Sequence, residues 1–194
     1  MSPSWPLEAE GVWIEVRCPR RAVPCGVLFL DRDGVVIEDH NYVHDPNDVA
    51  LVPGAAMLIA AANTAAVPVG IVTNQAGIDR GLYDWDGFAA VTQRIDELLA
   101  PHGARIDAVA AAPFHPDFTK GYGAAQARWR KPGPQMILAL AERINAAPAR
   151  SWMVGDKDID LRAAEAAGLA GAILVDQATD LFEVRTKLKG LLRE

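Results

Sequence analysis

Residues 27–35 read VLFLDRDGV, in which four apolar residues lead into two aspartates that flank an arginine. A short continuous apolar run is typical of a strand that is covered on both faces. The polar residues after it would lie at the carboxyl end of that strand, where open parallel sheets bind their ligands. This stretch therefore predicts both a class of fold and the place to look for function.

The same order of strand and helix recurs along the chain. Further apolar runs predict strands, and segments with one apolar face predict the helices between them. The expected strands cover 67–72, 106–112, 152–154 and 172–175, and the expected helices cover about 55–65, 85–99, 134–147, 159–167 and 180–192, with a long loop from 113 to about 130. This alternation predicts an α/β fold, a doubly wound parallel sheet with helices on both faces.

The first 24 residues do not follow this pattern. Four prolines surround a single strand-like patch at 12–16, and proline interrupts anything longer. We therefore expect an N-terminal extension over residues 1–24, with one edge strand, followed by one domain over residues 25–194.

Composition excludes several classes of protein. The 194 residues are 51% hydrophobic with a net charge of −6, which argues against disorder and against fibrous repeats. Without a basic stripe, the chain is a poor candidate to bind nucleic acid or an anionic membrane. The longest apolar run, 55–62, is too short to cross a bilayer, and no secretory signal is visible, so we expect a cytoplasmic protein. Two cysteines are too few for a disulfide framework.

Polar residues follow four of the predicted strands. They are Asp31-Arg32-Asp33-Gly34, Thr73-Asn74-Gln75, Arg130-Lys131-Pro132 at the end of the long loop, and Gly155-Asp156-Lys157-Asp158-Ile159-Asp160. Carboxylates gathered at a sheet edge repel one another unless a cation lies among them, and hard oxygen ligands select Mg²⁺. One carboxylate could attack phosphorus and another could protonate the leaving alcohol, while a hydroxyl and an ammonium stabilise the phosphoryl oxygens.

Each of these motifs alone has an ordinary structural interpretation. Asp-x-Asp-Gly is usually a solvated turn, and Thr-Asn after a strand usually forms a turn or a helix cap. The four motifs occur in order, each after a predicted strand, and this joint occurrence favours chemistry.

The motifs resemble those of the haloacid dehalogenase superfamily of aspartate-nucleophile phosphatases. The matching segments are LFLDRDGV (28–35), IVTN (71–74), Lys131-Pro132 and VGDKDID (154–160). Within the superfamily, FLDRDGVV (29–36), DHNYVH (39–44), TNQAGIDRG (73–81) and Arg130-Lys-Pro resemble the branch of D,D-heptose 1,7-bisphosphate phosphatases and histidinol phosphatases. The resemblance covers about 26–175 and implies a single HAD-like domain with no large cap.

The resemblance also implies a role for each central residue. Asp31 would be the nucleophile and a Mg²⁺ ligand. Asp33 would be the general acid and base, with its backbone carbonyl on the metal. Thr73 and Lys131 would stabilise the transferring phosphoryl group, and Asp156 would be the third Mg²⁺ ligand.

Further residues are implied around the substrate. The expected contacts are Asp39, His40, Asn41, Tyr42, Asn74, Gln75, Ala76, Arg130 and Lys157. Arg130 would contact the distal part of the substrate, such as a second phosphate. His40 and His44 have the alternative of being solvated loop residues. Asp160 would orient Lys131 or the metal shell, and Asp158 would cap a helix.

The long loop departs from this branch, whose members commonly hold it with a Cys-x-His…Cys-x-Cys zinc site. The matching positions here are Ala112, Phe114, Ala127 and Trp129. We therefore expect no structural zinc, and we expect Phe114 to pack against Trp129 and so to tether the loop and aim Arg130. The alternative is that the two aromatic residues only cover a mobile loop.

The preferred interpretation is a Mg²⁺-dependent phosphatase that hydrolyses a small phosphorylated metabolite, most simply a heptose bisphosphate or related sugar phosphate, through an aspartyl-phosphate intermediate. We expect a monomer or a small homo-oligomer. A histidinol-phosphate phosphatase is the alternative enzyme. A receiver-like phosphoacceptor would not need Asp33 and would be shorter, and a silent binding protein of this fold would not need the full set of motif residues.

Overall fold

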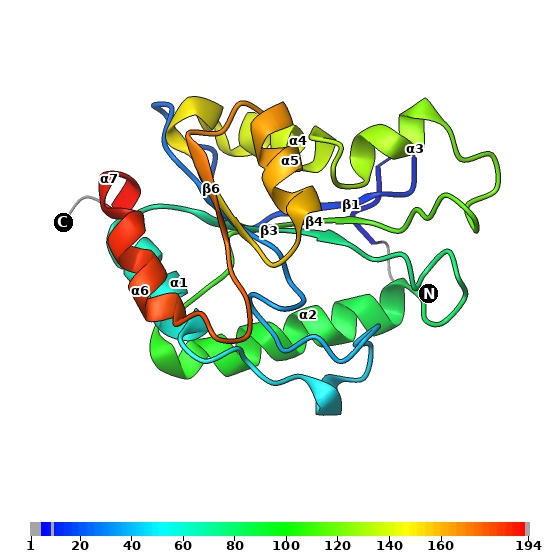
Figure 1. The fold of residues 1–194 in the computed structure, drawn as a ribbon, viewed down its shortest axis with the longest axis horizontal. Coiled ribbons are helices and arrows are strands. Elements are labelled where there is room, and N and C mark those ends of the chain that lie inside the picture. The colour runs from blue at the N-terminus through cyan, green and yellow to red at the C-terminus, as the bar shows by residue number, and fades with distance from the viewer. Residues whose placement is uncertain (1–4, 9, 193–194) are drawn as a thin grey trace.

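The computed structural model describes residues 5–8 and 10–192 and contains a six-stranded sheet between two layers of helices (Figure 1). The strands are β1 (Trp13–Val16), β2 (Leu28–Leu30), β3 (Val69–Asn74), β4 (Ala108–Ala112), β5 (Trp152–Gly155) and β6 (Gly171–Leu174), in the spatial order β1-β4-β3-β2-β5-β6. Strands β2 to β6 all run parallel to one another, and β1 alone among the strands of this sheet runs antiparallel. The predicted α/β class and doubly wound sheet are confirmed.

Helices cover both faces of this sheet, as Figure 1 shows. They are α1 (Ala55–Thr64), α2 (Trp85–Leu99), α3 (Ala124–Trp129), α4 (Gln135–Ile144), α5 (Asp158–Ala166), α6 (Leu181–Lys187) and α7 (Lys189–Leu192), with short 3₁₀ turns at Pro46–Asp48, Ala100–His102 and Pro148–Arg150. Because successive strand residues point to opposite faces, Leu28 and Leu30 pack with α1, α2 and α6, whereas Phe29 packs with α4 and α5. No helix among the described residues is long and apolar enough to span a membrane.

The predicted edge strand in the first 24 residues forms as β1. It pairs antiparallel with β4, with Trp13 opposite Ala111. The ring centroid of Trp13 lies 5.2 Å from that of Phe88 and 5.6 Å from that of Trp85, and both of these residues belong to α2. The described part of this segment is therefore attached to the sheet and to one helix layer.

Two expectations about helices were wrong. The loop from 113 to about 130 contains α3, whose sequence AAQARW consists mostly of good helix formers. The last helix is not continuous over 180–192, because its backbone leaves helical geometry at Leu188, and the residues that follow include Gly190, a poor helix former.

The sheet register brings the motif residues to one edge. Leu30 of β2 pairs with Ile71 of β3 and with Val154 of β5, so the residues that follow these three positions are neighbours. The Asp31 N–H, which follows β2, donates to the Val154 carbonyl at 3.0 Å. The carboxyl ends of three central strands thus form the floor of the candidate site.

Candidate active site

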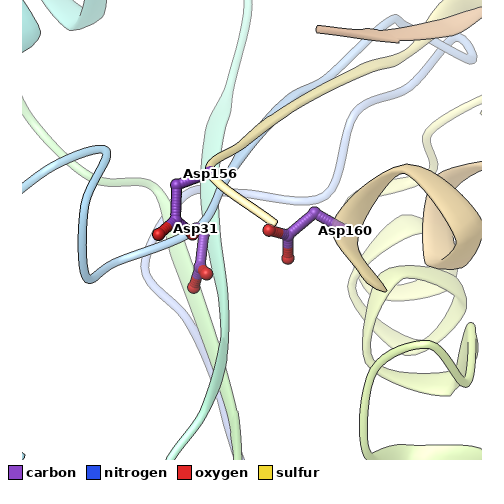
Figure 2. Close-up of side chains that lie close together, drawn as sticks. All are labelled: Asp31, Asp156 and Asp160. Carbon is purple, nitrogen blue, oxygen red and sulfur yellow. The ribbon is translucent and has the colours of Figure 1, made fainter. Parts of the chain in front are cut away.

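Three carboxylates and one lysine meet at this edge. Asp31 follows β2, Asp156 follows β5, and Asp160 lies in the first turn of α5 and points toward Asp31 (Figure 2). One oxygen from each carboxylate lies within 4.8 Å of the other two. The Lys131 Nζ lies 2.9 Å from Asp31 Oδ1 and 2.6 Å from Asp160 Oδ1, and it donates to the Val72 carbonyl at 2.8 Å. The lysine is therefore fixed between two carboxylates beneath the cavity.

The electrostatics of this group are dominated by burial. Burial raises the pKa of Asp31 to about 7 against the opposing charge of Lys131, and the nearby charges of Asp160 and Asp33 add to the rise. Burial alone would lower the pKa of Lys131, but Asp31 and Asp160 together raise it. Lys131 is therefore a permanent cation, and the carboxylates around it still carry more negative charge than it balances.

Two of the three carboxylates have an oxygen that could bind a metal. Both oxygens of Asp160 already have protein partners, because Oδ1 forms an ion pair with Lys131 and Oδ2 accepts the Lys157 N–H at 3.0 Å. Asp31 Oδ1 accepts the Arg32 N–H at 2.7 Å as well as facing Lys131, which leaves Oδ2. Asp156 Oδ1 is buried without a hydrogen-bond partner. Hard carboxylate oxygens in a place with excess negative charge suit Mg²⁺.

A glycine lets the chain pass close to Asp156. Gly34 has a φ of +81°, and a Cβ on this residue would lie 2.6 Å from Asp156 Oδ2. A larger residue would therefore be strained and would displace the carboxylate. The glycine of the DRDG motif thus has a physical role in the candidate metal site.

Asp33 is held beside Asp31 by two side chains. The buried Arg32 guanidinium contacts the Asp33 carboxylate through Nε and through Nη2, which lies 2.9 Å from Oδ1. Gln75 Nε2 donates to Asp33 Oδ2 at 3.1 Å. A second carboxyl is therefore present next to the first, in the arrangement that proton transfer to a leaving group needs.

Gln75 also connects Thr73 to the pocket wall. Its Nε2 donates to Thr73 Oγ1 at 2.8 Å, and its Oε1 accepts from the Tyr83 hydroxyl at 2.6 Å. Burial raises the pKa of Tyr83 to about 12, so this hydroxyl stays a donor. Because both amide hydrogens of Gln75 are used, its side chain positions Thr73 and Asp33.

A cavity of about 280 Å³ opens above these residues. Of the residues expected around the substrate, those that line it are Asp39, Asn41, Tyr42, Asn74, Gln75, Ala76, Arg130 and Lys157. His40 is not among them, and its ring lies 3.1 Å from Glu38. His44 also lies outside and stacks on Tyr83 with ring centroids 5.4 Å apart. A larger cavity, of about 880 Å³, lies beside Cys25 and Arg150 at the other end of the strands.

Sequence reasoning missed five residues of the cavity wall: Arg32, Arg80, Tyr83, His115 and Ile159. Arg80 could have been found, because it lies inside the TNQAGIDRG segment at a strand end and carries a charge. Tyr83 and His115 come from long connections and have no pattern that distinguishes them from ordinary loop residues. Their contribution depends on contacts that only the folded chain shows.

The long loop closes on itself through its two ends. Phe114 and Trp129 are both buried in the hydrophobic cluster on the α4 side of the sheet. Arg130 Nη1 donates to the Phe114 carbonyl at 2.9 Å. Burial lowers the pKa of Arg130, and the nearby charge of Arg80 adds to this effect. Arg80 and Arg130 both line the cavity, so it carries two guanidinium groups in addition to Lys131.

Comparisons with known proteins agree with this geometry. A HAD-hydrolase-like family model matches residues 128–183. A D-glycero-beta-D-manno-heptose-1,7-bisphosphate 7-phosphatase of Mesorhizobium japonicum is 42% identical over 88% of this chain and 79% of its own length. A D-glycero-alpha-D-manno-heptose-1,7-bisphosphate 7-phosphatase of Burkholderia mallei is 38% identical over 86% of this chain and 87% of its own length.

Solved structures give the same result. A HAD-like phosphatase from Mesorhizobium loti has a TM-score of 0.80 and 40% identity, over 88% of this chain and 82% of that one. The D,D-heptose 1,7-bisphosphate phosphatase from B. bronchiseptica, complexed with magnesium and phosphate, has a TM-score of 0.70 and 33% identity, over 84% of this chain and 86% of that one.

Proposed function

Because the chain belongs to the HAD-like phosphatases, in the family of the D-glycero-D-manno-heptose-1,7-bisphosphate 7-phosphatases, we propose that it removes the 7-phosphate from this heptose bisphosphate. One observation carries the proposal. The cavity that contains the Asp31–Lys131 pair also contains Arg130, a cation that forms no carboxylate pair among the described residues. A substrate with two phosphates could place one beside Asp31 and Lys131 and the other beside Arg130.

Mg²⁺ is the proposed cofactor, as in the magnesium complex of the relative from B. bronchiseptica. Asp31, Asp156 and the backbone carbonyl of Asp33 would hold it. The free oxygen of Asp31, the buried unpartnered oxygen of Asp156 and the excess of negative charge support this assignment. When bound, the ion neutralises the carboxylates and draws electron density from the phosphoryl oxygens.

In the first chemical step, a carboxylate oxygen of Asp31 forms a bond to phosphorus and the ester P–O bond breaks. The Asp33 carboxyl gives its proton to the departing sugar oxygen, which leaves as an alcohol. Lys131 and the Thr73 hydroxyl stabilise the charge on the phosphoryl oxygens in the transition state. Asp160 and the Val72 carbonyl hold the Lys131 ammonium in place during this step.

In the second step, water attacks the phosphorus of the aspartyl phosphate. Asp33 takes a proton from this water, the acyl P–O bond breaks, and inorganic phosphate leaves with Asp31 restored as a carboxylate. Arg32 and Gln75 keep the Asp33 carboxyl beside Asp31 for both proton transfers. Arg130 binds the phosphate that is not cleaved. We also propose that the enzyme acts in the cytoplasm as a monomer or small homo-oligomer, without nucleic-acid or membrane partners.

The proposal is tested by comparing substrates with purified enzyme and Mg²⁺. Phosphate release from both anomers of the heptose bisphosphate is followed by ³¹P NMR. We expect the phosphate at C7 to be released and the phosphate at C1 to be retained in the product. Histidinol phosphate has only one phosphate, so it leaves the cation at the far end of the cavity unpaired. Its kcat/KM should therefore be lower than that of the heptose bisphosphate by a factor of about 100 or more. EDTA should abolish turnover and added Mg²⁺ should restore it. Preference for histidinol phosphate, or loss of the C1 phosphate, would overturn the proposal.

A further inference from the structure

Two adjacent residues connect the second loop, here residues 75–83, to the third loop, residues 113–130. The Thr119 hydroxyl donates to the Asp79 carboxylate. Arg80 Nη2 lies 2.8 Å from His115 Nε2, and the Arg80 guanidinium carbon lies 4.6 Å from the centre of the Phe118 ring. Asp79 and Arg80 thus contact the third loop at three points, through an ion–dipole, a hydrogen-bond and a cation–π interaction.

The part of the third loop that they contact is itself a closed turn. The His115 N–H donates to Thr119 Oγ1 at 2.7 Å, and the Thr119 N–H donates back to the His115 carbonyl at 2.9 Å. The rings of His115 and Phe118 lie 5.1 Å apart, nearly edge to face. Because these residues hold one another, a contact at Thr119 restrains the whole turn.

The second loop provides a firm support for this contact. The Arg80 N–H donates to the Ala76 carbonyl at 3.2 Å, and the Leu82 N–H donates to the Gly77 carbonyl at 2.9 Å. These turns follow directly after β3, the strand that carries Thr73. The third loop is therefore anchored to a segment whose position is set by the sheet.

The restrained turn is adjacent to the residue that holds Arg130. Phe114 precedes His115, and its carbonyl accepts the hydrogen bond from Arg130 Nη1. A displacement of His115 would therefore move the Phe114 carbonyl and release the Arg130 guanidinium. Asp79 and Thr119 do not line the catalytic cavity and face an outer hollow, so they affect a substrate only through the two loops.

We propose that Asp79 and Arg80 are positioning residues that fix the third loop through Thr119 and His115 and thereby set the place of Arg130. This inference rests on the proposed function, because Arg130 is taken as the contact for the phosphate that is not cleaved. The consequence is a separation of roles. Asp79 and Arg80 determine how well the far end of the substrate is recognised, whereas Gln75 and Tyr83 of the same loop hold the groups that act beside Asp31.

The test uses Asp79→Ala, Thr119→Val and the double variant, with two substrates. Heptose 1,7-bisphosphate needs both ends of the cavity, whereas p-nitrophenyl phosphate needs only the end at Asp31. Each single variant should raise KM for the bisphosphate roughly 10-fold, the usual size of a lost hydrogen bond to a charged group, with kcat within about twofold. The double variant should be no worse than Thr119→Val alone, because that substitution already removes the contact with Asp79. Neither constant for p-nitrophenyl phosphate should change.

Lys120→Ala is the matched control, since Lys120 is exposed and neighbours Thr119 in the same loop. Hydrogen–deuterium exchange over residues 113–130 gives a readout that needs no substrate: it should become faster in Thr119→Val and stay unchanged in Lys120→Ala. Unchanged exchange, an unchanged KM, or an equal loss with both substrates would overturn the inference. If the wild-type enzyme failed to hydrolyse the bisphosphate, the proposed function would fall while the exchange experiment would still decide the contact between the loops.

Discussion

The catalytic floor and the pocket rim of this protein are held in place by different means. The floor consists of Asp31, Thr73, Lys131 and Asp160, all of them buried. They are fixed by strand ends and by ion pairs between 2.6 and 2.9 Å. The rim consists of residues 38–44, 75–83 and 113–130, and it includes residues as exposed as Phe118, at 52%. Its parts are held mainly by contacts that side chains make with residues distant in the sequence.

This difference predicts how variants behave. A change in the floor alters groups that act on the transferring phosphoryl group, so it should lower kcat. Gln75 and Tyr83 hold Thr73 and Asp33 and so belong with the floor in this respect. A change elsewhere in the rim alters the binding of the far part of the substrate, so it should raise KM and leave kcat nearly constant.

The largest effect should come from Asp31→Asn. The amide keeps the shape of the side chain but removes the nucleophile, so kcat should fall by a factor on the order of 10⁴ or more. Phosphate release under saturating substrate measures this. A circular-dichroism spectrum like that of the wild type serves as the control for folding. Turnover at the normal rate would contradict a covalent intermediate on this residue.

Asp160→Asn should have the next largest effect. It removes one of the two carboxylates beside Lys131, so the ammonium loses part of its compensation and its fixed position. We expect kcat to fall about 100-fold and the free energy of unfolding to fall by about 3 kcal/mol, as for other broken buried pairs. Steady-state kinetics and urea unfolding measure the two quantities. An unchanged kcat would mean that Asp31 and the Val72 carbonyl suffice to hold the lysine.

The contrast also explains what could be predicted from the sequence. Asp31, Thr73 and Asp156 follow apolar runs within one or two residues, and parallel strands bring such positions together whatever the loops do. The sheet and most helices were predictable for the same reason, because their periodicity is local. Arg80 and His115 could not be paired in advance, because their contact joins two irregular segments. Helix α3 was missed because it lies within a long connection with no apolar face of its own.

On the rim, Arg130→Ala should raise KM for the bisphosphate about 10-fold with little change in kcat, since it removes a charged contact to the non-reacting phosphate. Arg128→Ala is a matched control, because Arg128 lies outside the cavity on α3 and its side chain bonds to Gln135. Kinetics with the bisphosphate and with p-nitrophenyl phosphate separate the two ends of the site. A fall in kcat with both substrates would place Arg130 on the floor instead.

A smaller effect on binding is expected from Phe114→Ala. The buried ring is lost from the cluster that contains Trp129, which should cost about 3 kcal/mol of unfolding free energy and loosen the base of the third loop. KM for the bisphosphate should then rise about fivefold, and Phe114→Leu, which keeps apolar volume, should recover most of the loss. Metal analysis of the wild-type protein should find no stoichiometric zinc. Zinc bound at one equivalent would contradict the apolar tether.

The smallest effect should come from His40→Ala, which tests where the rim ends. The motif predicts that His40 binds substrate, yet its ring pairs with Glu38 and lies outside the cavity, whereas the neighbouring Asp39 lines it and lies 3.3 Å from Lys157. An exposed pair contributes little, so His40→Ala should change KM by less than about twofold, and Asp39→Ala should change it by about threefold. Kinetics on both variants under identical conditions make the comparison. A larger rise in KM with His40→Ala than with Asp39→Ala would mean that residues 38–44 rearrange when the substrate binds. The conformation of the rim would then depend on the substrate as well as on the contacts between the loops.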